Sequence, residues 1–89
     1  MTTITYTKTG LVIDGHAGDP VVCHGISAIS QMVANYVIDN HWGSASSSDG
    51  RLKIDVSEQY FGCDLFRAMR VAFKDIAQEY PNNVKIIYS

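Results

Sequence analysis

The stretch that decides the fold reads DPVVCHGISAISQMVANY and runs from Asp19 to Tyr36. Asp19 can cap the start of a helix, and Pro20 suits the first helical position because its missing N–H needs no partner there. Apolar residues then recur at helical spacing and predict one buried stripe, made of Val22, Ile26, Ile29, Val33 and Tyr36. The pattern fades near Asp39 and Asn40, so we predict one long helix over this region.

Four segments around this helix carry strand signals, because apolar and β-branched side chains alternate in them or form short runs. These segments are 3–7, 11–15, 52–56 and 84–88. The first two are separated by a short turn, Lys8-Thr9-Gly10, and therefore predict a hairpin.

A second helix is predicted from Cys63 or Asp64 to Tyr80, where Pro81 ends it. Serine and glycine dominate residues 41–50, which we interpret as a flexible, solvated connector. The resulting order is β-β-α-β-α-β. It predicts an α+β fold in which two helices cover a mixed four-stranded sheet.

Length and charge narrow the classes of function. The 89 residues suit one small domain, 1–89, whose core is marginal in size, so dimerisation would be a natural supplement. A net charge of −2 leaves no basic surplus to neutralise phosphates, so we expect no direct nucleic-acid partner. The apolar runs are only a few residues long, so we expect no membrane span.

Cysteine usage and the opening residues indicate a compartment. Cys23 and Cys63 do not make a disulfide framework, and no charged n-region is followed by an apolar h-region. We therefore expect a cytoplasmic protein with reduced thiols. Zinc needs three or four convergent ligands, and Cys23 and His24 point in different directions on a helix, so we expect no metal and no cofactor.

One pair of residues could carry chemistry. His16 stands at the end of a predicted strand, and Cys23 stands in the first turn of the next helix, with only six residues between them. A first-turn thiol feels the positive end of the helix dipole, which favours the nucleophilic thiolate. A nearby imidazole can take the thiol proton and later give it to a leaving amine. The N–H groups of the same turn, including that of Cys23, could hold an oxyanion.

Three further side chains could support this pair. Ser27 follows Cys23 by four residues and shares its helical face, where small residues would leave room for a substrate. Asp14 or Asp19 could orient the imidazole as a third member. The plain alternative is that Cys23 is an inert packing thiol, because free cysteine is among the most buried residue types. Spacing alone does not decide between these readings.

The chain as a whole resembles the ribosomal-processing cysteine protease family, Prp. The residues that carry the resemblance are Gly15-His16-Ala17, Val22-Cys23, Gly25, Ser27 and the tail segment from Glu79 to Lys85. The resemblance implies a Cys–His endopeptidase, active as a homodimer, with Cys23 as nucleophile and His16 as base. It implies a protein substrate, either a large-subunit ribosomal protein that loses an N-terminal extension or a phage capsid or scaffold protein.

The sequence also departs from the family pattern. The connection from His16 to Cys23 is shorter than in typical members, and Pro20 stands where an Asp is usual. His24 follows the cysteine, where a small residue is usual. The short connection and Pro20 motivate an alternative function: a non-catalytic homodimeric binding module that retains the same fold.

Overall fold

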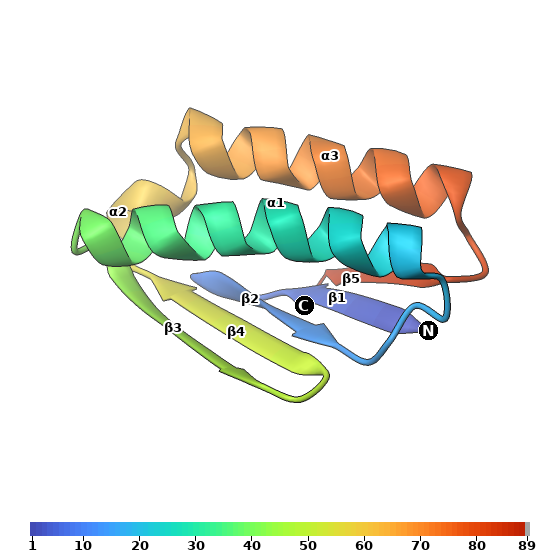
Figure 1. Ribbon diagram of the computed structural model, residues 1–89. Helices are drawn as coiled ribbons and strands as arrows, with labels where there is room; N and C mark the ends of the chain where they lie inside the picture. The colour runs from blue at the N-terminus through green and yellow to red at the C-terminus, as the bar shows by residue number, and fades with distance from the viewer. Residues whose placement is uncertain (89) are drawn as a thin grey trace.

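The computed structural model describes residues 1–88, in which two long helices lie on a sheet in two layers (Figure 1). In chain order the elements are β1 Thr2–Tyr6, β2 Gly10–Asp14, α1 Pro20–Asp39, β3 Gly43–Ser48, β4 Arg51–Val56, α2 Glu58–Phe61, α3 Asp64–Glu79 and β5 Val84–Tyr88. The α+β class is as predicted. The prediction of four strands and two helices was wrong in detail, because the described residues form five strands and three helices.

The sheet is mixed, as predicted, and its strand order is β3-β4-β2-β1-β5. β1 pairs antiparallel with β2 in the predicted hairpin and parallel with β5 on its other side. β4 then pairs antiparallel with β2. Both long helices lie on one face of the sheet (Figure 1). Helix α1 contacts the edge strand β3, and α3 contacts the opposite edge strand, β5.

The prediction of a flexible connector over 41–50 was wrong for most of that segment, which forms the edge strand β3. β3 pairs antiparallel with β4 along its whole length, although its serines give no apolar alternation. The turn between the two strands is Asp49-Gly50, and Gly50 has a φ of 69°, which glycine adopts without the strain of a Cβ. A tight turn and backbone pairing therefore make this strand, with little help from buried side chains.

Helix α1 starts where the sequence predicts. Asp19 is its N-cap and accepts a 2.9 Å hydrogen bond from the N–H of Val21, and Pro20 is the first helical residue. The buried stripe is rotated slightly from the prediction and consists of Val22, Ile26, Ser30, Val33, Ala34 and Val37. Tyr36 is 45 % exposed, so its place in the predicted stripe was wrong.

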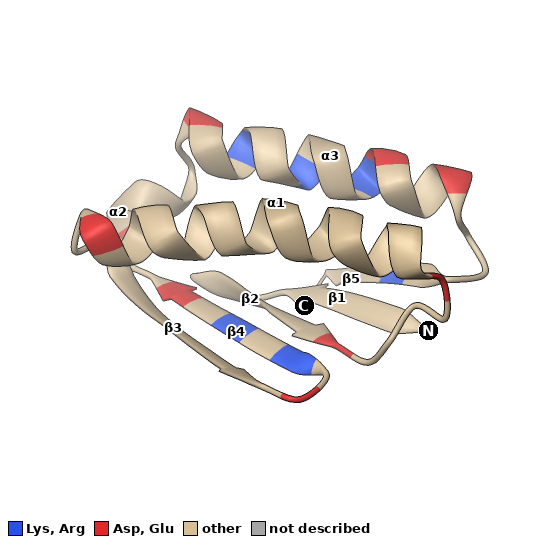
Figure 2. Ribbon diagram, in the orientation of Figure 1, with Lys and Arg blue, Asp and Glu red and all other residues tan. Residues whose placement is uncertain are grey.

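The outer face of α1 is unusually apolar. By length and composition alone, α1 is long and apolar enough to cross a membrane. The sequence-based expectation of no membrane span considered only uninterrupted apolar runs and did not anticipate this property of the helix. In the fold its inner face packs on the sheet as a core helix. Figure 2 shows α1 without Lys, Arg, Asp or Glu except Asp39 at its end. Val21, Met32 and Ile38 are large apolar residues exposed on this helix.

Helix α3 lies beside α1 and closes the core over the other half of the sheet (Figure 1). Its buried residues are Phe66, Met69 and Phe73. These side chains join one apolar cluster with residues of α1 and the inner strands. The core therefore fixes α1 against the sheet, and with it the end of α1 at which Cys23 stands.

Candidate active site

Cys23 lies in the first turn of α1, half-buried, as a free thiol. Its Sγ accepts a hydrogen bond from the backbone N–H of Ala17, with a nitrogen-to-sulfur distance of 3.4 Å. Ala17 is only 3 % exposed, so this donor is shielded from water. This contact points the positive end of an N–H dipole at the sulfur, at the N-terminal end of a helix. The backbone N–H of Cys23 itself donates to the carbonyl of Asp19.

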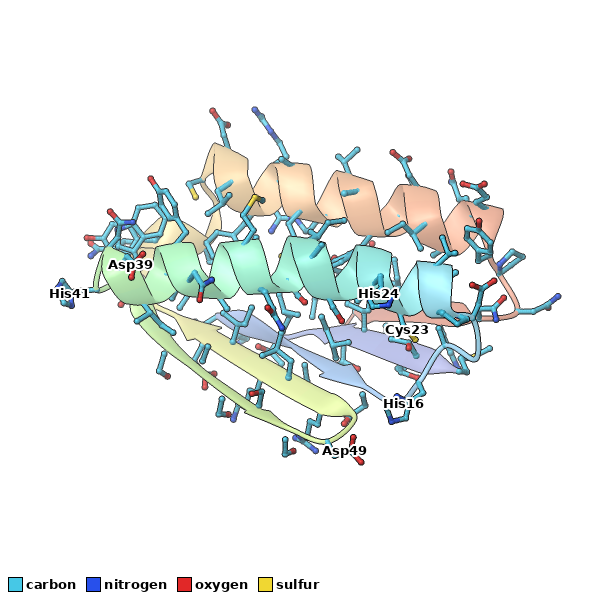
Figure 3. The ribbon with its side chains drawn as sticks, in the orientation of Figure 1. His16, Cys23, His24, Asp39, His41 and Asp49 are labelled. Atoms are coloured by element: carbon cyan, nitrogen blue, oxygen red, sulfur yellow. The ribbon has the colours of Figure 1, made fainter. Side chains whose placement is uncertain are left out.

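His16 lies on the loop after β2, and its imidazole faces the β3–β4 turn. Its Nε2 lies 4.0 Å from Oδ1 of Asp49, and a Cβ placed on Gly50 would lie 3.0 Å from the same nitrogen. The side chain is 70 % exposed. Figure 3 shows the ring between Cys23 and Asp49 in this view. Among residues 1–88, the His16 imidazole lies near the Asp49 carboxylate and makes no hydrogen bond with Cys23.

Two contacts from distant parts of the chain hold the segment that runs from Gly15 through His16 toward Cys23. The N–H of Gly15 donates to the carbonyl of Gly50 at 2.7 Å. The side-chain amide of Asn83, in the turn before β5, donates to the carbonyl of Ala17 at 2.7 Å. Gly15 has a φ of 90°, and a Cβ there would lie 2.4 Å from the carbonyl oxygen of Met1, so glycine is required at this point.

The two carboxylates that the sequence offered as a third member have other partners. Asp14 lies 3.7 Å from Arg51 across the β2–β4 pair. Asp19 caps α1 through the N–H of Val21. The carboxylate that lies next to His16 is Asp49 instead.

A cleft of about 510 Å³ runs between α1 and the β3–β4 hairpin, with His16 and Cys23 at one end. Ser27 lines it next to Cys23, and the hydroxyl of the buried Ser30 donates to the Ser27 carbonyl. Ile38 lines the opposite end, near the C-terminus of α1. Small side chains dominate the β3 wall, which is made of Ala45, Ser46, Ser47 and Ser48. The geometry therefore brings His16, Cys23 and Ser27 to one open groove.

The other histidines lie away from this groove. Figure 3 shows His41 beyond the far end of α1, and His24 does not line the cleft. In the part of the chain that the structure describes, no three His, Cys, Asp or Glu side chains gather into a metal-binding group.

Sequence reasoning missed three residues of this site: Asp49, Gly50 and Asn83. Asp-Gly is a strong hairpin-turn signal, so Asp49-Gly50 could have predicted the β3–β4 turn. Nothing local could have placed that turn against His16, because the contact depends on how β4 pairs with β2. The same holds for Asn83, which is 66 residues away from Ala17.

A half-buried thiol at a helix N-terminus, next to a histidine in an open cleft, defines a candidate thiol-dependent hydrolytic site. The chain belongs to the cysteine protease Prp family, whose sequence model matches residues 1–85. The family match makes the protein a cysteine protease by class. Among curated protein sequences, none matches the chain.

Solved structures share the fold over almost the whole chain. The essential ribosomal processing protease Prp from Staphylococcus aureus, in complex with a covalently linked product peptide, has a TM-score of 0.78 and 24 % identity. That comparison covers 99 % of this chain and 97 % of the S. aureus chain. SMU.848 from Streptococcus mutans has a TM-score of 0.67 and 25 % identity, over 99 % of this chain and 93 % of that chain.

Proposed function

We propose that this protein is an endopeptidase in which Cys23 is the nucleophile and His16 is the general base. The observation that carries the proposal is the position of the Cys23 sulfur. The sulfur accepts a hydrogen bond from the Ala17 N–H. It lies in the first turn of α1, at the end of a cleft that His16 also lines. A thiol at a helix N-terminus that accepts an N–H is a position at which reactive cysteines occur, and the cleft gives a substrate access to it.

The imidazole is within reach of the sulfur although it faces the β3–β4 turn. Ala17 N lies 3.4 Å from Sγ. Standard peptide dimensions then put the His16 Cα within about 6 Å of Sγ. The His16 side chain is exposed, and we propose that a small rotation turns one ring nitrogen toward the thiol while the other stays near Asp49. Catalytic hydrogen bonds are often long before a substrate binds.

In the proposed reaction, His16 accepts and donates the proton in each step. The imidazole takes the Cys23 proton, and Sγ attacks the carbonyl carbon of the scissile peptide bond. When the C–N bond breaks, the imidazolium gives that proton to the leaving amine, and a thioester remains on Cys23. The neutral imidazole then takes a proton from water as the water attacks the thioester. The acid product leaves and the thiol is restored.

The Ala17 N–H is the donor best placed for the oxyanion of these steps. It already points at Sγ, beside which the attacked carbonyl would lie. The Cys23 N–H, an expected donor, is engaged by the Asp19 carbonyl. Ser27 lines the adjoining wall and would contact the substrate chain rather than the reacting bond.

The cleft supports a polypeptide substrate bound in an extended form. It follows α1 from Cys23 to Ile38, fifteen residues further on, or about 22 Å along the helix axis. That length accommodates about six or seven residues of extended chain. We propose that the substrate is the N-terminal extension of a large-subunit ribosomal protein or a phage capsid or scaffold protein. The Prp fold supports the first, since the S. aureus relative is a ribosomal processing protease.

Incubating the purified protein with each candidate precursor tests this function. Mass spectrometry should find one new N-terminus in one precursor and none in its processed form. The second candidate function is a non-catalytic binding module, which the outward-facing His16 favours. Binding without any new N-terminus, together with a Cys23 that reacts with iodoacetamide only above the ordinary thiol range of about pH 8.5, would support that module instead.

Asp49 is proposed to orient His16. It faces Nε2, which leaves Nδ1 as the nitrogen that exchanges the proton with Cys23. Because both side chains are exposed, we expect Asp49→Asn to lower kcat/KM only up to about fivefold, with a smaller effect at high salt. Asp55→Asn, on the exposed side of β4, is the matched control and should leave kcat/KM unchanged. Equal values for both variants would remove Asp49 from the site.

We also propose a homodimer that works in the cytoplasm. The apolar outer face of α1 supports association, because the exposed side chains of Val21 and Met32, with no Lys, Arg, Asp or Glu between them, favour burial against a second copy. Sedimentation should show twice the chain mass, and Met32→Asp should shift it to the monomer. Ile87→Asp, on β5, is the control. A reducing compartment would keep Cys23, a free thiol, available for catalysis.

A further inference from the structure

Asn83 is tied to the loop that carries the site although it belongs to the turn between α3 and β5. Its backbone N–H donates to the Tyr80 carbonyl, and its own carbonyl accepts from the Thr2 N–H at 2.9 Å. These two bonds fix the residue to α3 and to the start of β1. Its side chain then reaches across to the carbonyl of Ala17 at 2.7 Å. Asn83 is half-buried, so this contact is partly protected from water.

The contact needs an amide at this position. The partner is a carbonyl oxygen, which only accepts, so the NH₂ group of Asn83 must face it. A carboxylate of the same shape would present only acceptors and would repel the carbonyl. The preceding residue, Asn82, is exposed. Two adjacent asparagines therefore differ in environment, and only Asn83 contacts Ala17.

Ala17 connects that amide to the thiol. Its carbonyl is held by Asn83 and its N–H points at Sγ of Cys23, so one buried residue receives both contacts. The chain on one side of Ala17 contains the exposed His16. On the other side is Gly18, whose φ of 82° needs the freedom of glycine. The Asn83 amide holds the Ala17–Gly18 peptide, and without it rotation about the Ala17 backbone bonds could turn the neighbouring Ala17 N–H away from the sulfur.

We infer that Asn83 is a positioning residue that keeps the Ala17 N–H aimed at Cys23 and thereby keeps the thiol reactive. The inference rests on the proposed function of Cys23. It adds a contact from the C-terminal part of the chain to a site otherwise built from β2, α1 and the β3–β4 turn.

The test measures the thiol itself, without a substrate. In a Cys63→Ser background, the rate of Cys23 alkylation by iodoacetamide is followed from pH 5 to pH 10, beside the melting temperature. Loss of one hydrogen bond to a charged group corresponds to about a tenfold change. We therefore expect Asn83→Asp and Asn83→Ala to lower the rate at pH 7 about tenfold and to move the midpoint of the profile to higher pH.

Asn82→Asp and Asn82→Ala are the matched controls, because the first adds the same charge one residue away. Both should give the profile of the parent protein. A purely structural role for Asn83 would lower the melting temperature and leave the midpoint where it is. Profiles of the Asn83 variants that overlay those of the Asn82 variants would overturn the inference.

A second measurement uses the parent protein and so does not depend on whether the Asn83 variants fold. In the isotope-labelled parent protein, alkylation of Cys23 should shift the side-chain NH₂ resonances of Asn83 and leave those of Asn82 in place. Unmoved Asn83 resonances would contradict the link through Ala17. The proposed function fails separately: a parent Cys23 that is unreactive at pH 7 removes the nucleophile, whereas a reactive Cys23 that cuts no precursor removes only the endopeptidase activity.

Discussion

We expect Cys23→Ala to abolish cleavage and leave the fold intact. Removing the only atom that forms the acyl-enzyme should lower kcat by about 10⁴-fold or more, because the remaining groups have no nucleophile to activate. The side chain is half-buried at the rim of the core, so its truncation should cost only about 1 kcal/mol of stability. Cleavage followed by mass spectrometry, with circular dichroism for the fold, measures both effects.

Cys63→Ala is the matched control for that experiment. Cys63 is also a free, half-buried thiol, and it precedes α3 as its N-cap residue. It does not line the cleft, so its loss should leave kcat within about twofold. Normal activity in Cys23→Ala would exclude Cys23 as the nucleophile. Loss of activity in both variants would indicate a general effect of thiol removal on the fold.

The part of the fold that the sequence predicts well is the part that rests on local chemistry. The start of α1 was predictable because Asp19 and Pro20 act within one turn, and the cap is present at 2.9 Å. The end of α3 was predictable for the same reason, since Pro81 follows its last turn. Hydrophobic periodicity then placed both long helices, although it misplaced Tyr36 by a fraction of a turn.

The strand β3 escaped prediction because its stability comes from its partner. Its serines are exposed and give no period-2 signal, so composition suggests a solvated connector. Backbone pairing with β4 and the Asp49-Gly50 turn make it a strand. Gly43 shows how close the two strands lie, because a Cβ there would be 1.9 Å from the Asp55 carbonyl oxygen. This close approach is visible only once the register is known.

The candidate site divides in the same way. His16 and Cys23 are joined by a short loop, so the sequence could place them near one another. Asp49 and Asn83 reach that loop only through tertiary structure, one from a hairpin turn and one from the turn before β5. Asp14 and Asp19 are closer in sequence, but Arg51 and the helix N-terminus engage them. Proximity along the chain therefore predicted the proposed pair His16 and Cys23, but it did not predict that Asp49 and Asn83 contact the loop that carries them.

His16→Ala is the second variant for which we expect a large loss. General acid–base catalysis contributes about 10²- to 10⁴-fold, so kcat should fall within that range while Cys23 remains open to iodoacetamide. His24→Ala, which changes a histidine outside the cleft, should leave kcat unchanged. Unequal effects of these two variants would separate a specific role of His16 from a general effect of removing an imidazole.

Added imidazole sharpens the test, because the site is open. The His16 side chain is 70 % exposed and borders the cleft, so its removal leaves a space that free imidazole can enter from solvent. Imidazole in the medium should then restore part of the lost activity, with a pH dependence that follows its neutral form. It should do nothing for Cys23→Ala. Failure of rescue alone would mean that the base must be held by the loop, since a free imidazole has the chemistry but lacks the orientation. Full activity of His16→Ala without imidazole would instead exclude His16 as the base.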